Sequence, residues 1–123
     1  MIHECIIGIG SNINAEQNFV AALSFLRQEH NLVAVSSTVI TTPIGITDQP
    51  DFLNGAARVI ITMERDAFRG YLKGVEDRLR RDRNSAKFGP RTIDLDIVVW
   101  DGNIIDKEYY TRDFLKTVVD EIS

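Results

Sequence analysis

The sequence has little of the chemistry that stabilises or anchors proteins outside the cytoplasm. Cys5 is the single cysteine, so no disulfide can form within the chain, and the two histidines, His3 and His30, make no metal-ligand pattern with it. No segment approaches the roughly 20 apolar residues that cross a bilayer, and the first residues show no secretory leader pattern. We therefore expect a cytoplasmic protein with no membrane partner.

Positive charge is also scarce. The chain carries 14 Lys and Arg against 18 Asp and Glu, a formal net charge of -4. Because affinity for nucleic acid comes from the summed contacts of Lys and Arg with phosphates, this balance argues against a nucleic-acid partner. With 44% hydrophobic residues, 8 Gly and 3 Pro in 123 residues, the composition is that of an ordinary globular protein. We expect one domain over residues 1–123.

The order of apolar patterns predicts the fold class. Short apolar or β-branched runs predict strands at 5–10, 32–41, 52–63 and 93–100, and helical spacing predicts helices at 14–28, 66–79 and 111–122. Asn12 or Asn14 is expected to cap the first helix. The polar stretch 80–91 is expected to be a loop. The resulting order is that of an α+β, ferredoxin-like β-α-β-β-α-β sandwich with a C-terminal helical addition.

Two aspartates stand out in the last predicted strand. Side chains alternate between the two faces of a strand, so Ile93, Leu95, Ile97 and Val99 are expected to face the core, while Asp94 and Asp96 project together from the other face. Their Cα atoms would lie about 6 to 7 Å apart. Two carboxylates this close favour a divalent cation between them, and Mg²⁺ suits carboxylate and phosphate oxygens. The alternative is an ordinary acidic, solvent-facing strand surface.

A cationic segment precedes this strand. It holds six of the 14 Lys and Arg residues, namely Arg78, Arg80, Arg81, Arg83, Lys87 and Arg91. A cationic loop next to a carboxylate pair suits a metal-bound polyphosphate, with guanidinium groups on the phosphate oxygens. The alternative is a solvated helix end, where Arg is favoured by the helix dipole. That alternative explains Arg78 and Arg80 and extends to Arg81, but it leaves Arg91 unexplained.

A third candidate feature is the loop between the second and third predicted strands. Phe52 offers an aromatic face and Asn54 an amide, which together suit a flat heteroaromatic ligand. The alternatives are core packing for Phe52 and a turn role for Asn54. Ser11 and Asn12, after the first strand, have a helix cap as their alternative role.

Four ordered motifs carry a resemblance to a known family. They are Gly10-Ser11-Asn12, Thr42-Pro43 with Gly45, the run from Gln49 to Asn54, and Phe88-Gly89-Pro90-Arg91-Thr92-Ile93-Asp94-Leu95-Asp96-Ile97. Together they closely resemble 6-hydroxymethyl-7,8-dihydropterin pyrophosphokinase, an enzyme of folate biosynthesis. The resemblance implies transfer of diphosphate from ATP to the hydroxymethyl group of the pterin, with release of AMP. It also implies Mg²⁺ as the cofactor, and ATP and the pterin as binding partners.

The resemblance also implies roles for individual residues. Asp94 and Asp96 would bind the metal, and Arg81 and Arg91 would act with them in catalysis. The implied ATP contacts are Glu76, Arg81, Arg83, Lys87, Phe88, Arg91, Ile97 and Arg112. The implied pterin contacts are Thr42, Pro43, Ile44, Phe52, Asn54 and Phe114.

The sequence departs from the family pattern after its last strand. The family usually carries a Pro-His segment there, but no histidine follows His30, and Arg112-Asp113-Phe114-Leu115 resembles the run beyond that segment. We therefore expect a short form that lacks the Pro-His segment. This leaves a second hypothesis, a catalytically degenerate paralogue that binds a pterin or a nucleotide. A weaker third hypothesis is an RNA-binding domain of the same topology, which would need aromatic pairs on a basic sheet face.

Overall fold

The computed structural model describes residues 1–80 and 92–123. Their elements are β1 (His3–Ser11), α1 (Ala15–Glu29), β2 (Asn31–Val35), β3 (Val39–Thr41), β4 (Phe52–Ile61), α2 (Arg65–Arg78), β5 (Asp94–Trp100), β6 (Asn103–Ile104), α3 (Glu108–Thr111) and α4 (Asp113–Glu121). The strands of this part of the chain form one antiparallel sheet in the order β2-β4-β1-β5-β6, and β3 also pairs with β4. The α+β, ferredoxin-like prediction is confirmed.

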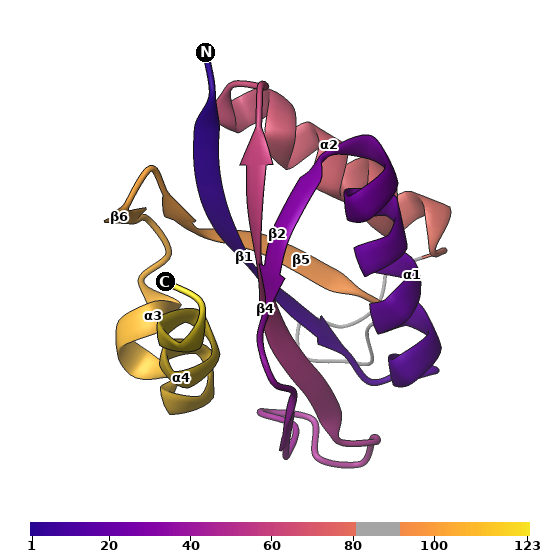
Figure 1. The fold of residues 1–123 in the computed structure, drawn as a ribbon. Coiled ribbons are helices and arrows are strands. Elements are labelled where there is room, and N and C mark those ends of the chain that lie inside the picture. The colour runs from indigo at the N-terminus through magenta and orange to yellow at the C-terminus, as the bar shows by residue number, and fades with distance from the viewer. Residues whose placement is uncertain (81–91) are drawn as a thin grey trace.

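The sheet lies between two helical layers (Figure 1). On one face, α1 and α2 bury side chains such as Phe19, Leu26 and Phe68 against the inward residues of β1, β4 and β5. On the other face, α3 and α4 bury Tyr109 and Val118 against a second, smaller apolar cluster. The large cluster follows from the helical spacing of apolar residues in α1 and α2, which gives each helix one apolar stripe.

The single strand predicted over 32–41 is in fact two strands, β2 and β3. The interruption lies at Ser36, whose N–H donates to the Ala56 carbonyl at 2.9 Å and whose hydroxyl accepts the Ala56 N–H at 2.8 Å. Because the serine side chain supplies the acceptor that a backbone carbonyl supplies in a regular ladder, the chain leaves β2 here. It then pairs again, as β3, with the first three residues of β4, Phe52 to Asn54, whereas β2 pairs with residues 57–60.

A bulge in β5 changes which side chains face the core. Ile6 pairs with Val99 and Ile7 pairs with Ile97, so Val98 is the extra residue. Ile93, Leu95 and Ile97 pack in the cluster beneath α1 and α2 as predicted. Val98 and Val99 instead pack on the α3 and α4 side. The prediction that Val99 shares the face of Leu95 was therefore wrong, because regular alternation ends at the bulge.

The ends of two helices also differ from the predictions. Asn14 is the N-cap residue of α1, but it has a left-handed backbone (φ 43°) and its side chain makes no capping hydrogen bond. The helix predicted over 111–122 is α3 and α4, separated by Arg112 in an extended conformation. Leu115, Val118 and Val119, which recur at helical spacing, are buried on one side of α4.

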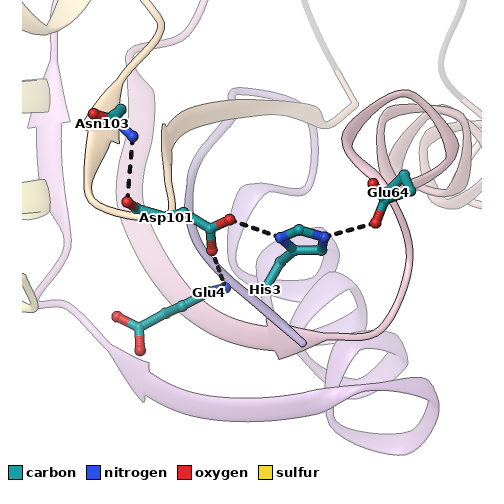
Figure 2. Close-up of polar contacts among 5 residues, drawn as sticks. All are labelled: His3, Glu4, Glu64, Asp101 and Asn103. Atoms are coloured by element: carbon teal, nitrogen blue, oxygen red, sulfur yellow. Dashed lines mark hydrogen bonds and ion pairs between the residues drawn. The ribbon is translucent and has the colours of Figure 1, made fainter. Parts of the chain in front are cut away.

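A hydrogen-bonded cluster ties three elements together at the end of the sheet where β1 begins (Figure 2). His3 lies between two acids, with Nδ1 2.7 Å from Asp101 Oδ2 and Nε2 2.7 Å from Glu64 Oε2. Because carboxylates only accept, both ring nitrogens must donate, and only the imidazolium form can do so. The hydrogen bonds to Asp101 and then Glu64 accordingly raise the pKa of His3 above 6.5. We call these three side chains the His3 clasp.

Candidate functional site

A pocket of about 270 Å³ opens on the face of the sheet that carries α3 and α4. Its walls come from β1, the segment from β3 to β4, the first half of β5, and the chain from β6 to α4. The residues that line it are Gly8, Ile9, Gly10, Thr41, Thr42, Ile44, Phe52, Asn54, Gly55, Asp94, Asp96, Val98, Asp106, Glu108, Arg112, Phe114 and Leu115.

The two aspartates of β5 lie in this pocket together. Asp94 and Asp96 both line it, while Leu95 between them is buried in the core on the opposite face. Reduced hydration inside the pocket, and then the neighbouring Asp94 carboxylate, raise the pKa of Asp96 to about 7. Asp96 nevertheless keeps an open side to solvent. The pair is therefore an acidic site that ligands can reach and that favours a positive charge.

Glu76 supports the strand that carries this pair. Its side chain is fully buried, and its Oε2 accepts the backbone N–H of Leu95 at 2.8 Å. Lys73 Nζ lies 3.7 Å from its other carboxylate oxygen. The hydrogen bond therefore fixes the β5 backbone between Asp94 and Asp96, from the side of α2. Glu76 itself is not among the residues that line the pocket.

Asn54 forms part of the opposite wall. Its Nδ2 donates to Thr41 Oγ1 at 2.8 Å and to the Val39 carbonyl at 3.2 Å, so β3 holds the amide group in place. Its Oδ1 points toward β1, since a Cβ added to Gly10 would lie 3.3 Å from that oxygen. Phe52 and Phe114 contribute apolar surface to the same pocket. This wall combines a fixed amide acceptor with aromatic rings.

Asn12 supports the loop above this wall rather than capping α1. Its Nδ2 donates to Gln49 Oε1 at 2.8 Å and to the Pro50 carbonyl at 2.9 Å. Gln49 in turn donates to the Ile46 carbonyl at 2.6 Å. The loop that leads from Thr42 to Phe52 is thus tied to the end of β1, which argues against the helix-cap alternative for Asn12.

Many of the predicted site residues meet in the pocket. Eight of them line it, namely Thr42, Ile44, Phe52, Asn54, Asp94, Asp96, Arg112 and Phe114. Pro43 does not line it, and Ile97 packs in the core beneath α1 and α2. The roles of these residues in binding and catalysis stay predictions. Five further predicted residues lie outside the described part of the chain: Arg81, Arg83, Lys87, Phe88 and Arg91.

Sequence reasoning missed several of the residues that line the pocket. Gly8 and Gly10 let the walls approach β1 closely, because a Cβ on Gly8 would lie 3.2 Å from Leu115 Cδ1. Their alternation along a strand is a recognisable signal of close approach. Asp106 and Glu108 also line the pocket. No spacing rule links them to Asp94 and Asp96, since they arrive there through the turn after β5.

The donor set of the pocket fits a hard divalent cation held partly by a ligand. Among residues 1–80 and 92–123, no three His, Cys, Asp or Glu side chains are grouped closely enough to hold a metal ion by themselves. Mg²⁺ does not require this, since it commonly takes one or two carboxylates and completes its shell with water and phosphate oxygens. Asp94 and Asp96 supply these carboxylates in one reachable place.

The fold and the site define a class of protein, a ferredoxin-like domain with an acidic, aromatic-walled pocket on the sheet face opposite α1 and α2. A family model narrows the class. The model of 7,8-dihydro-6-hydroxymethylpterin-pyrophosphokinase matches residues 6–123, so the chain belongs to this family. The resemblance stated from the sequence motifs is confirmed.

Curated relatives agree with the family. The chain is 34% identical over 109 residues to the 2-amino-4-hydroxy-6-hydroxymethyldihydropteridine pyrophosphokinase of Pseudomonas aeruginosa, covering 86% of this chain and 67% of the relative. It is 32% identical over 105 residues to the Bacillus subtilis protein of the same name, covering 83% and 62%. It is 35% identical over 99 residues to a folate synthesis bifunctional protein of Arabidopsis thaliana, covering 79% of this chain but 20% of that relative. The chain thus spans about a fifth to two thirds of these relatives.

Proposed function

We propose that this chain transfers diphosphate from ATP to the hydroxymethyl group of 6-hydroxymethyl-7,8-dihydropterin, releasing AMP, as a step of folate biosynthesis. Membership of the pyrophosphokinase family supports the reaction. The observation that carries the proposal is that Asp94 and Asp96 share one pocket with Phe52, Asn54 and Phe114. One pocket thereby offers both a site for a metal-bound phosphate and a site for a flat heterocycle.

The pterin end of the pocket would be the wall between β3 and α4. A pterin is a flat ring with N–H donors along one edge, so it suits aromatic faces and a fixed acceptor. Phe52 and Phe114 supply aromatic surface, and Asn54 presents Oδ1 because its Nδ2 already donates to β3. We propose that Thr42, Pro43 and Ile44 complete this end by holding the loop over the ring.

The phosphate end would be the first half of β5 with Arg112. Asp94 and Asp96 would hold Mg²⁺, which when bound supplies positive charge to the polyphosphate. Arg112 lines the same pocket and would neutralise phosphate oxygens. The family resemblance extends this end to Arg81, Arg83, Lys87, Phe88 and Arg91, and to Glu76 of α2 and Ile97 of β5, which lie on the side of the sheet that faces α1 and α2. These roles are proposals.

The reaction needs placement and charge neutralisation more than proton transfer. The hydroxymethyl oxygen forms a bond to the β-phosphorus of ATP, and the bond from that phosphorus to the oxygen bridging it to the α-phosphate breaks. AMP leaves with that oxygen, and the hydroxyl proton passes to solvent. The residues of the pocket would hold the two reactants in line and keep water out of the pterin end.

The test is a direct assay of AMP release. Purified protein, ATP, Mg²⁺ and the reduced hydroxymethyl pterin are mixed, and AMP and the pterin diphosphate are quantified together. Equal amounts of the two products are expected, and neither should form when the pterin is omitted. No AMP at saturating substrates would reject the enzymatic proposal.

A second candidate is a catalytically degenerate paralogue that binds a pterin or a nucleotide. It is favoured by the absence of any histidine after His30, where the family usually has a Pro-His segment. Ligand-dependent thermal stabilisation without turnover would support this candidate.

The single domain over 1–123 and the cytoplasmic location stay predictions. Within the described residues, none of the helices is long and apolar enough to cross a membrane.

A further inference from the structure

The segment after β6 is fixed against the bulge of β5. The carbonyl of Val98 accepts the N–H of Ile105 at 2.8 Å and the N–H of Asp106 at 3.4 Å. Asp106 Oδ1 then accepts the N–H of Glu108 at 2.9 Å, which begins α3. The bulge therefore determines where Asp106 and Glu108 stand, and both line the pocket next to the aspartates of β5.

The pocket has an uneven charge balance. Its described lining carries the carboxylates of Asp94, Asp96, Asp106 and Glu108 but a single guanidinium, that of Arg112. Within the described lining, Arg112 is therefore the cation that a polyanionic ligand meets in this pocket.

Glu108 lies close enough to Arg112 to restrict the orientation of its guanidinium group. Glu108 Oε1 lies 3.4 Å from Arg112 Nη2, and the backbone N–H of Arg112 donates to the Glu108 carbonyl at 2.9 Å. The two side chains are partly exposed, at 53% for Glu108 and 30% for Arg112. A half-exposed pair of this kind is weak and exchangeable, because water screens it. It can restrict the rotamers of Arg112 without preventing the other guanidinium N–H groups from meeting an anion.

We propose that Glu108 is a positioning residue, which orients Arg112 toward the polyphosphate of ATP. The inference rests on the proposed function, because it takes ATP as the ligand of this pocket. A carboxylate near a polyanion would by itself weaken binding through repulsion. Orientation of Arg112 has the opposite effect, since it lowers the conformational entropy that binding must remove. The two effects differ in sign, so they can be separated.

A double-mutant cycle measures whether Glu108 strengthens or weakens ATP binding, and whether this effect requires Arg112. The affinity for ATP with Mg²⁺ is determined by calorimetry for the unaltered chain, E108Q, R112Q and the double variant. We expect E108Q to weaken binding about three- to tenfold when Arg112 is present, a coupling in the range of contacting charged residues. In the R112Q background, the same change should leave affinity unchanged or slightly improve it.

Two further variants sharpen the result. E108D keeps the negative charge but withdraws it by one methylene, so it should weaken binding as E108Q does if orientation matters. D113N makes the same charge change as a glutamate-to-glutamine substitution, at an exposed residue of α4 that does not line the pocket, and it should bind ATP as the unaltered chain does. Thermal unfolding of each variant confirms that it is folded.

The outcomes that overturn the proposal are distinct. Tighter binding by E108Q in both backgrounds would mean that Glu108 acts only as a repulsive charge. Equal weakening in both backgrounds would mean that it acts through the fold and not through Arg112. ATP binding without AMP production would reject the proposed activity alone, and the cycle would still decide the role of Glu108. No ATP binding by the unaltered chain would reject both.

Discussion

Two carboxylate clusters lie at opposite ends of β5, and they differ in how their charge is balanced. Asp101, just after the strand, accepts the N–H of Glu4 and a hydrogen bond from His3, and in that order these lower its pKa. At the start of the strand, reduced hydration and Asp94 raise the pKa of Asp96 to about 7. The first cluster is stabilised by groups of the chain itself, whereas the second favours an added cation. We infer that the first has a structural role and the second binds ligands.

The comparison is tested most severely by removing one acid from each cluster. D96N should lower AMP production about 10²- to 10³-fold, the range seen when one transition-state electrostatic contact is lost. D101N, at the other end of the strand, should leave the rate of a folded sample unchanged. Steady-state assays of AMP release on both variants check this. Equal loss of activity in the two would remove the functional distinction between the clusters.

The next largest expected effect is on stability, and it concerns the hydrogen bond from Leu95 to Glu76, which supports β5 between Asp94 and Asp96. E76A leaves the buried N–H of Leu95 without its Glu76 acceptor, so we expect the free energy of unfolding to fall by about 1 to 3 kcal/mol. E76Q retains an acceptor oxygen and should lose less. Urea unfolding of the two variants measures the difference. Equal stability of E76A and the unaltered chain would show that β5 does not depend on this hydrogen bond.

The His3 clasp should make stability depend on pH. Since the folded protein raises the pKa of His3 above its ordinary 6.5, its stabilisation is fully present below pH 6.5 and is lost as the pH rises through the raised pKa. The melting temperature of the unaltered chain should fall across that interval, and that of H3Q should fall less. Melting curves from pH 5.5 to 9 provide the measurement. Parallel profiles for the two proteins would contradict the imidazolium assignment.

The smallest expected effect ranks the two acids of the clasp. Asp101 accepts both from His3 and from the Glu4 backbone, whereas the Glu64 side chain is 73% exposed. D101N should therefore lower the melting temperature more than E64Q does, and the pKa of His3, followed by NMR, should fall in both variants. The reverse order in melting temperature would mean that the link to α2 is the more important half of the clasp.

Much of the fold could be predicted because it depends on local patterns. Helical spacing predicted α1 and α2, and β-branched runs predicted β1, β4 and β5, within a few residues of their observed ends. The division between β2 and β3 was missed because it depends on the hydrogen bond between Ser36 and Ala56, which belongs to a distant strand. The switch of Val99 to the other face was missed for a similar reason, since the bulge exists only in the pairing of β5 with β1.

Some residues of the candidate site could likewise be predicted from local sequence patterns, and others could not. The alternation of Asp94, Leu95 and Asp96 was enough to predict that the two aspartates share a face, and the family motifs pointed to Phe52, Asn54 and Arg112 as companions. Asp106 and Glu108 were not predicted, since they reach the pocket through the carbonyl of Val98. The members of the His3 clasp, separated by 98 and 61 positions along the chain, carry no shared motif.

The order of neighbouring residues was sufficient to predict the alternation of β5 from Ile93 to Ile97, the apolar stripes of the helices and the family to which the chain belongs. The side chains that meet the aspartate pair, and the position of His3 between Asp101 and Glu64, come from distant parts of the sequence and are visible only in the folded chain. Strand register and helix packing set the distances between segments that are remote in the sequence. A change of a few ångströms in the distance between two charged groups decides whether they form a stabilising ion pair or are screened by water and salt.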